Sequence, residues 1–171
     1  MSDWRALLVD DDSGLTAIFR ESKTVAVLGA KADSSEPAYY VAAYLHSRGY
    51  HVRPVNPRFA GRRLHDADTV ASLRDLAEPT DVIEVFRRPE YLPGHADEIL
   101  ALPWRPKTVW FQLGIRHDGA AEKLAQQNKL TRESSGSITF TQERRFYPEE
   151  SLAEALYENP RETPLITPMA L

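Results

Sequence analysis

Short apolar runs alternate along this chain with longer segments whose apolar residues recur at helical spacing. Five runs are rich in β-branched and aromatic residues, which is typical of buried strands. They occupy residues 24–29, 50–55, 81–86, 108–112 and 137–141. Helical spacing predicts one helix that begins near Ser13, with Ser13 as its N-cap, and others over residues 37–49, 70–76, 89–102 and 118–128.

Strands that alternate with helices in this way predict a parallel sheet, because parallel neighbours need a crossover connection. We therefore expect an α/β fold with a single Rossmann-like, doubly wound parallel sheet of about five strands, in the order 3-2-1-4-5, with helices on both faces. Ligands of such sheets bind at the carboxyl ends of the strands. The residues at these ends are Gly29, Asn56, residues 86–88 and Gln112.

The last thirty or so residues differ in character from the rest of the chain. Residues 1–141 are expected to form one domain with its core over residues 13–130. Residues 142–171 predict a short helix around Leu152 and Leu156, followed by an extended tail that Pro160, Pro164 and Pro168 interrupt. This segment is a candidate contact for a homodimer or a protein partner.

Composition excludes several classes of function. The chain of 171 residues carries a net charge of −4, which argues against general nucleic-acid binding. It has no cysteine, so disulfides, thiolate metal sites and a cysteine nucleophile are absent, and its five histidines show no metal-ligand spacing. No apolar run spans a membrane, and the N-terminus does not read as a secretory signal, so the expected location of this soluble protein is the cytoplasm.

The first strand, turn and helix predict a phosphate-binding corner. The run that ends at Gly29 is followed by a loop through Lys31 to Pro37, where the helix begins. A loop that enters a helix N-terminus presents amides to phosphate groups. The second strand ends at residues 55–58 without the acidic residue that holds the ribose hydroxyls in NAD sites, which argues against NAD.

A set of short stretches occurs in order along the chain: residues 24–30, 37–41, 44–45, 49–50, 54–57, 81–82, 85–88, 109–110 and 112–115. Taken in order, these stretches resemble the small stand-alone CoA-binding proteins, which share their fold with the N-terminal domain of the succinyl-CoA synthetase α subunit. The resemblance implies coenzyme A or an acyl-CoA as the ligand.

The resemblance also implies which residues contact CoA. Gly29, Ala30 and the loop through Lys31 to Pro37 would meet the phosphates, and Tyr40 also belongs to the implied binding set. The adenosine end would meet the second strand end and the pantetheine arm the fourth. The implied set also contains Asn56, Pro57, Arg58, Phe86, Arg87, Arg88, Gln112, Gly114 and Ile115. Candidates for the 3′-phosphate are Lys31, Arg53, Arg58, Arg62 and Arg63.

Two features depart from the family pattern. Glu36 stands where the family often has an arginine, and a carboxylate there would repel phosphate unless it points away. Family members commonly carry an Asp-Arg-Cys segment after the final strand, whereas residues 131–147 contain no cysteine. Thiol chemistry at that position is therefore absent.

These observations favour non-catalytic binding of CoA or an acyl-CoA, because the chain shows no complete catalytic set and we expect no enzyme activity. Two alternatives stay open. An NADP-dependent enzyme would use Arg58, Arg62 and Arg63 for the 2′-phosphate. Alternatively, the nucleotide fold would be a scaffold for protein interaction through the C-terminal segment.

Overall fold

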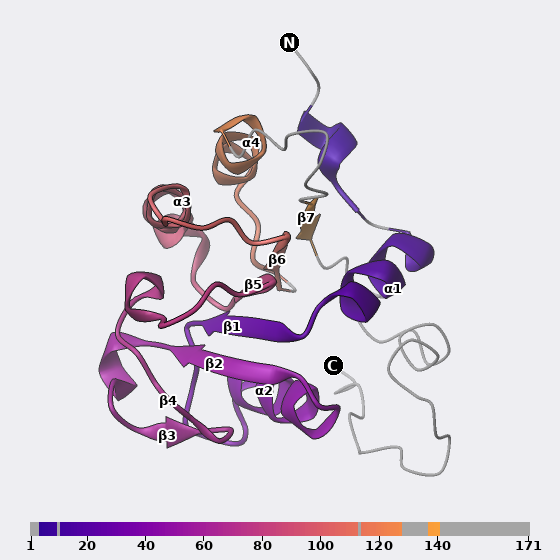
Figure 1. Ribbon diagram of the computed structural model, residues 1–171. Helices are drawn as coiled ribbons and strands as arrows, with labels where there is room; N and C mark the ends of the chain where they lie inside the picture. Colours follow the sequence, from indigo (N-terminus) through magenta and orange to yellow (C-terminus); the bar gives the residue numbers. More distant parts are fainter. Residues whose placement is uncertain (1–3, 10, 113, 128–136, 141–171) are drawn as a thin grey trace.

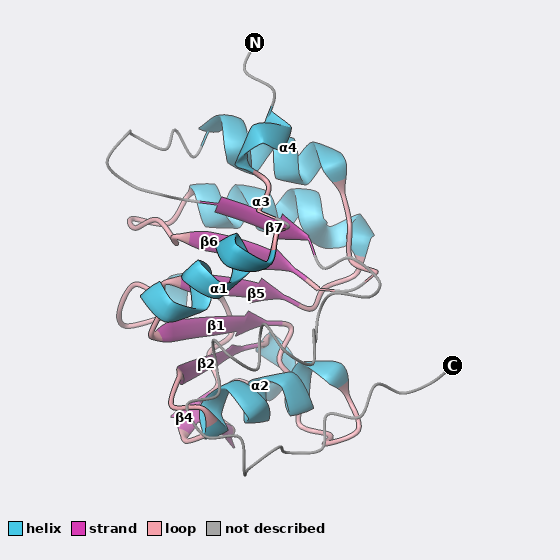
Figure 2. Cartoon of the chain, turned by 90° about the vertical axis from the view of Figure 1, so that its right-hand side faces the viewer, coloured by secondary structure: helices cyan, strands magenta, loops and turns pink. Residues whose placement is uncertain are grey.

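The computed structural model describes residues 4–9, 11–112, 114–127 and 137–140 (Figure 1). Its main sheet is fully parallel and has five strands: β1 (Thr24–Leu28), β2 (His51–Val55), β5 (Val82–Val85), β6 (Thr108–Phe111) and β7 (Ser137–Phe140). Figure 2 shows them side by side in the order β2-β1-β5-β6-β7. The predicted α/β sheet of five strands is confirmed.

Helices cover both faces of this sheet. The helices α1 (Asp12–Glu21) and α2 (Pro37–Ser47) pack on one face, where Phe19 and Leu45 meet Val25 and Trp110 of the sheet. The helices α3 (Leu92–Leu100) and α4 (Asp118–Gln127) pack on the opposite face against a second apolar cluster that includes Ile83. The domain is therefore a three-layer sandwich, as the doubly wound pattern predicts.

The helix starts follow local capping chemistry. The Asp11 carboxylate accepts hydrogen bonds from the Gly14 amide at 2.9 Å and from the Ser13 hydroxyl at 2.6 Å, so Asp11 caps α1 and the predicted Ser13 cap is wrong. Pro37 occupies the first turn of α2, where its missing N–H costs no hydrogen bond.

The strand order differs from the predicted 3-2-1-4-5. Numbered along the chain, the five strands lie in the order 2-1-3-4-5, so the third strand pairs with the first. The reason lies in β2. Pro54 lacks an N–H donor, and its carbonyl points away from β1 and accepts from the Val70 amide at 3.1 Å. A proline in a strand belongs at a sheet edge. The topological switch point therefore lies between β1 and β5.

The chain after β2 protects this edge before it crosses to β5. A turn, η2 (Pro57–Phe59), leads into a two-stranded hairpin of β3 (Arg63–Leu64) and β4 (Ala67–Asp68). Val70 then forms an isolated bridge with Val55. Only residues 73–75 of the predicted 70–76 helix are helical, as the 3-10 turn η3 (Leu73–Asp75), because Val70 is held in extended pairing.

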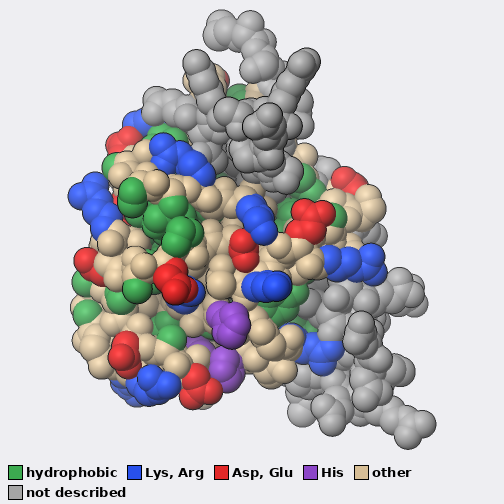
Figure 3. Space-filling view, viewed as in Figure 1, with side chains coloured by type: hydrophobic (Ala, Val, Ile, Leu, Met, Phe, Trp, Pro, Cys, Tyr) green, Lys and Arg blue, Asp and Glu red, His purple; other side chains and the backbone are tan. Residues whose placement is uncertain are grey.

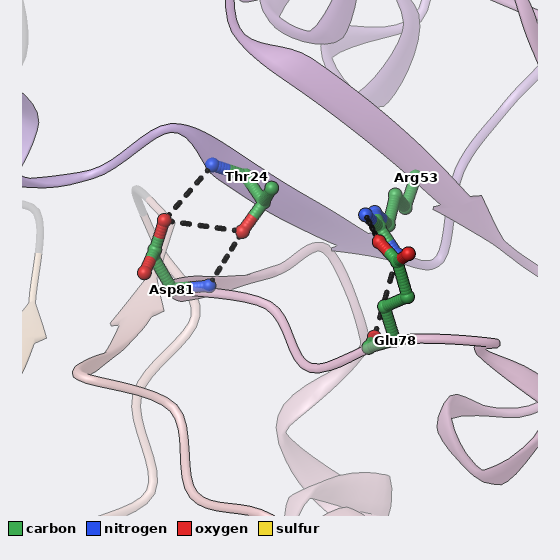
Figure 4. A network of polar contacts seen from close by, with 4 residues as sticks. All are labelled: Thr24, Arg53, Glu78 and Asp81. Atoms are coloured by element: carbon green, nitrogen blue, oxygen red, sulfur yellow. Dashed lines mark hydrogen bonds and ion pairs between the residues drawn. The ribbon is translucent and has the colours of Figure 1, made fainter.

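Polar contacts fasten the amino-terminal edge of the sheet, opposite the strand ends that bind ligands in this fold (Figure 4). The Asp81 carboxylate accepts from the amides of Lys23 and Thr24, from the Thr24 hydroxyl, and from Lys107 at 2.9 Å. Burial alone would raise the pKa of Asp81, but these hydrogen bonds outweigh it and hold the pKa at about 2.

Two further turns complete the described chain: η1 (Trp4–Leu7) beside α4, and η4 (Pro89–Tyr91) before α3. The predicted helix and tail over residues 142–171 lie outside the described residues. Across the described part of the chain, no helix combines the length and apolar character needed to cross a membrane.

Candidate functional site

The carboxyl ends of β1 and β5 approach each other closely at the switch point. Gly29 directly follows β1 and has a φ of 95°, a conformation that favours glycine. A Cβ on Gly29 would collide with the carbonyl oxygen of Phe86 and lie 2.9 Å from Cδ of Arg87. Gly29 is thus required by the packing of the strand ends, and its small size also brings the Arg87 stem alongside the loop that follows β1.

The loop between β1 and α2 presents amide groups at the start of a helix. The Gly29 and Ala30 amides both donate to the Val55 carbonyl, at 2.9 and 3.3 Å, so the protein already uses them. Among the described residues, the amides of residues 31–34 donate to no acceptor. Asp33 shapes this loop by accepting from the Ser35 amide at 2.9 Å. The amides that remain for a phosphate therefore begin at Lys31.

Glu36 is partly neutralised in this loop. Its carboxylate forms an ion pair with the Lys31 ammonium at 3.7 Å, and both side chains are about two-fifths exposed. The negative charge introduced by the departure from the family pattern therefore has a local counter-charge. Beyond it, Pro37 is exposed in the first turn of α2, and Tyr40 is 38 % exposed one turn further on.

Asn56 connects the ends of β1 and β2. Its buried side chain donates to the Ala30 carbonyl at 2.8 Å and accepts from the Arg58 amide at 3.0 Å. Both polar atoms thus serve the protein, and Asn56 shapes the site by holding the two loops together. Pro57 and Arg58 follow in η2 and are exposed, with the Arg58 guanidinium 5.6 Å from the Phe59 ring centre.

The two neighbouring arginines after β5 have different environments. Arg87 is half-buried, its Nε donates to Nε2 of His95 at 3.2 Å, and its guanidinium lies 5.5 Å from the Tyr91 ring centre. Its two terminal nitrogens bond to no described residue. The Arg88 side chain is 79 % exposed, and its contact among the described residues is a 3.9 Å ion pair with Glu90. Arg87 is therefore the better-ordered cation at the switch point.

The sequence prediction missed the residues that hold Arg87. His95 and Glu98 lie on α3, and Nδ1 of His95 is 3.0 Å from a carboxylate oxygen of Glu98. The sequence signal for this pair was the i, i+3 spacing of His95 and Glu98 on a helix that begins shortly after Arg87 and Arg88. This spacing places the two side chains on one helical face.

A buried polar pair lies beneath the ends of β5 and β6. Gln112 donates to Oε1 of Glu84, and both side chains are at most 5 % exposed. Burial raises the pKa of Glu84 to about 8, although the Gln112 hydrogen bond opposes this shift. The other carboxyl oxygen of Glu84 has no hydrogen-bond partner among the described residues.

A turn follows Gln112 at the end of β6. The Ile115 amide donates to the Gln112 carbonyl at 2.9 Å, and Gly114 within the turn has a φ of 74°. Gly114 is exposed, whereas Ile115 is partly buried against the α3 and α4 layer. This turn follows β6, two strands along from β1, at the carboxyl edge of the sheet.

The other basic candidates are not equivalent. Arg53 donates to the Glu78 carboxylate at 2.9 Å, and Arg63 pairs with Asp68 at 3.7 Å. On the face drawn in Figure 3, Lys and Arg side chains are scattered among Asp and Glu, which argues against a broad anionic partner on this face. No three His, Asp or Glu side chains come together as a metal site in the described ranges.

Comparison with known proteins agrees with this geometry. The family model described as CoA binding domain matches residues 23–140. The Bacillus subtilis protein YneT is 30% identical over 112 residues, which cover 66% of this chain and 80% of that protein. A solved Thermus thermophilus structure shares 44% identity with a TM-score of 0.69, and the match covers 77% of this chain and 91% of that one. A Pyrococcus horikoshii protein at 22% identity and a TM-score of 0.67 shares the fold over 78% of this chain and 86% of its own.

Proposed function

This chain belongs to the CoA-binding domain family, and on that premise we propose that it binds coenzyme A or an acyl-CoA without catalysing a reaction. One observation carries the proposal beyond family membership. The loop amides of residues 31–34 and the terminal nitrogens of Arg87 flank the β1/β5 switch point and have no partner among the described residues.

In this proposal the diphosphate of CoA occupies the loop before α2. The free amides and the positive end of the helix dipole stabilise its charge, and Arg87 contributes paired donors. The exposed Arg58 and Arg62 are the remaining cations beside the β2 end for a 3′-phosphate. The pantetheine arm would run along the carboxyl edge toward Gln112 and the turn at Gly114.

The donor set fits this ligand, and the polar contacts of the site support a binding role. The hydrogen bonds of Asn56 and Gln112 are directed within the protein. These side chains connect the strand ends and loops around the proposed site.

Titration calorimetry with CoA, dephospho-CoA, acetyl-CoA and NADPH tests the proposal. We expect CoA and acetyl-CoA to bind at micromolar concentration and NADPH to bind far more weakly. Arg87→Met should lower CoA affinity by roughly 10-fold or more, the loss expected for a hydrogen-bonded charge. Arg88→Met is the matched control and should change it little. Tighter binding of NADPH than of CoA would favour the NADP-dependent alternative and contradict the proposal.

A further inference from the structure

We propose that His95 is a positioning residue of the CoA site, which fixes the Arg87 guanidinium beside Gly29 with both terminal nitrogens free for a phosphate group. This inference rests on the proposed function, because it explains how one of the binding groups is held. It assigns a role to a partly buried side-chain network on α3 that the strand-end residues leave unexplained.

Three contacts restrict the Arg87 side chain along its length. Its stem lies against Gly29, where a Cβ would be 2.9 Å from Cδ. Its Nε donates to Nε2 of His95 at 3.2 Å, and its guanidinium lies 5.5 Å from the Tyr91 ring centre. A guanidinium held at Nε keeps its terminal pair of nitrogens available, and this pair matches two oxygens of a phosphate.

The contact to Arg87 determines the tautomer of His95. Arginine is a donor only, so Nε2 of His95 must accept and carries no proton. The proton of the neutral ring is then on Nδ1, which donates to Glu98 at 3.0 Å. The Arg87 contact thus requires the neutral ring, because a protonated imidazole has no acceptor nitrogen.

Glu98 is itself fixed by the protein. Its second carboxylate oxygen accepts from the Leu73 amide at 3.0 Å, and the His95 and Glu98 side chains are only 20% and 18% exposed. The hydrogen bond from His95 is the main cause that lowers the pKa of Glu98, which keeps it an acceptor. A continuous chain of contacts therefore runs from η3 through Glu98 and His95 to Arg87.

The neighbouring arginine shows what this chain of contacts changes. Arg88 has one long, solvent-exposed ion pair, so a ligand that used Arg88 would have to immobilise a flexible side chain. Ordering such a side chain costs about 0.5–1.5 kcal/mol, which corresponds to roughly 2- to 12-fold in affinity. The network around His95 meets this cost during folding, before the ligand arrives.

Two substitutions of His95 separate positioning from simple packing. Asn places an amide near the Nδ1 position and keeps the bond to Glu98, but it does not reach Arg87. Gln extends to the Nε2 position and restores an acceptor for Arg87. We expect His95→Asn to lower CoA affinity by roughly 3- to 10-fold and His95→Gln to stay within about 3-fold of the unsubstituted protein. In an Arg87→Met background, His95→Asn should cause no further loss.

Calorimetry of these variants with CoA and with pantetheine gives the test, and nitrogen NMR of His95 gives a readout that needs no ligand. In the NMR spectrum, the network predicts that Nε2 of His95 is unprotonated and that Nδ1 carries the proton. In calorimetry, it predicts that His95→Asn leaves the affinity for pantetheine unchanged. Equal losses for Asn and Gln, or a loss that persists without Arg87, would overturn the positioning role. If the unsubstituted protein binds CoA and His95→Asn binds it equally well, only this inference fails; if the unsubstituted protein binds no CoA, the proposed function fails with it.

Discussion

Replacement of Glu84 by glutamine should make this protein more stable at neutral and alkaline pH. Glu84 lies in the central strand β5 with 3% of its surface exposed. Gln112 donates to one carboxyl oxygen, and the other has no described partner. Burial raises the pKa of this carboxyl from 4.5 to about 8. The folded protein therefore holds a proton that the unfolded chain releases.

The magnitude follows from linkage between protonation and folding. For a carboxyl whose pKa is raised in the folded state, stability is greatest below the unfolded pKa and falls as the pH rises toward the folded pKa. The free energy of unfolding falls by about 1.36 kcal/mol per pH unit above the unfolded pKa of 4.5, so it is lower by about 3 kcal/mol at pH 7. The loss is below about 1 kcal/mol at pH 5 and levels off above about pH 8.

Glutamine keeps the size of the side chain and an acceptor for Gln112 but has no proton to lose. Urea unfolding from pH 5 to 9 should therefore show Glu84→Gln within about 1 kcal/mol of the unsubstituted protein at pH 5 and about 3 kcal/mol more stable at pH 7. Glu21→Gln, at an exposed position on α1, is the control for general loss of negative charge. Parallel pH profiles for the Glu84 variant and the unsubstituted protein would refute the reasoning.

Other perturbations have equally definite expectations. Gly29→Ala should destabilise the protein through about 1–2 kcal/mol of left-handed backbone strain and through a collision with the residues that follow β5. Gly49→Ala, at a φ of 89° with open space around it, should introduce the backbone strain alone. Thermal unfolding should therefore show the larger loss at Gly29, and equal losses would contradict the close approach. Asp81→Asn should lower the free energy of unfolding by about 2 kcal/mol at pH 7. The lowered pKa of Asp81, about 2 against 3.8, stabilises the folded protein above pH 3.8, and this contribution is lost as the pH falls toward 2. A stability difference that persists at pH 2 in urea unfolding would disprove this. Glu36→Gln should break the ion pair with Lys31 and raise CoA affinity about 3-fold at low salt. Calorimetry measures this change, and an unchanged affinity would contradict it.

The fold class followed from the sequence because each buried strand is a short β-branched run between helices. Strand and helix bounds were predicted to within a few residues wherever the apolar period was clear, as in β1 and α2. The order of the strands was predicted wrongly, although Pro54 carried the necessary information. Its missing donor places β2 at the sheet edge, and this brings β5 beside β1 and moves the switch point there.

The sequence could place the candidate residues at the strand ends, but it could not predict the contacts that each of them makes. In the structure the strand ends and the turn glycine lie together at the carboxyl edge of the sheet, as expected for parallel strands. Whether Asn56 contacts a ligand or the protein depends on which loops it can reach, and the structure shows both of its polar atoms bonded within the protein. His95 escaped notice because its partner Arg87 comes from a different element, so no spacing rule connects them.

The most direct test of the central claim is amide NMR of the nitrogen-labelled protein during titration with CoA, because it reports both whether the ligand binds and where. The account predicts saturable shifts for the amides of residues 31–36, of Ala38 and of residues 86–88, at the β1/β5 switch point. Amides around Thr24 and Asp81, at the opposite edge of the sheet, should stay unchanged. A spectrum that CoA leaves unaltered, or shifts confined to the amino-terminal edge, would contradict the account.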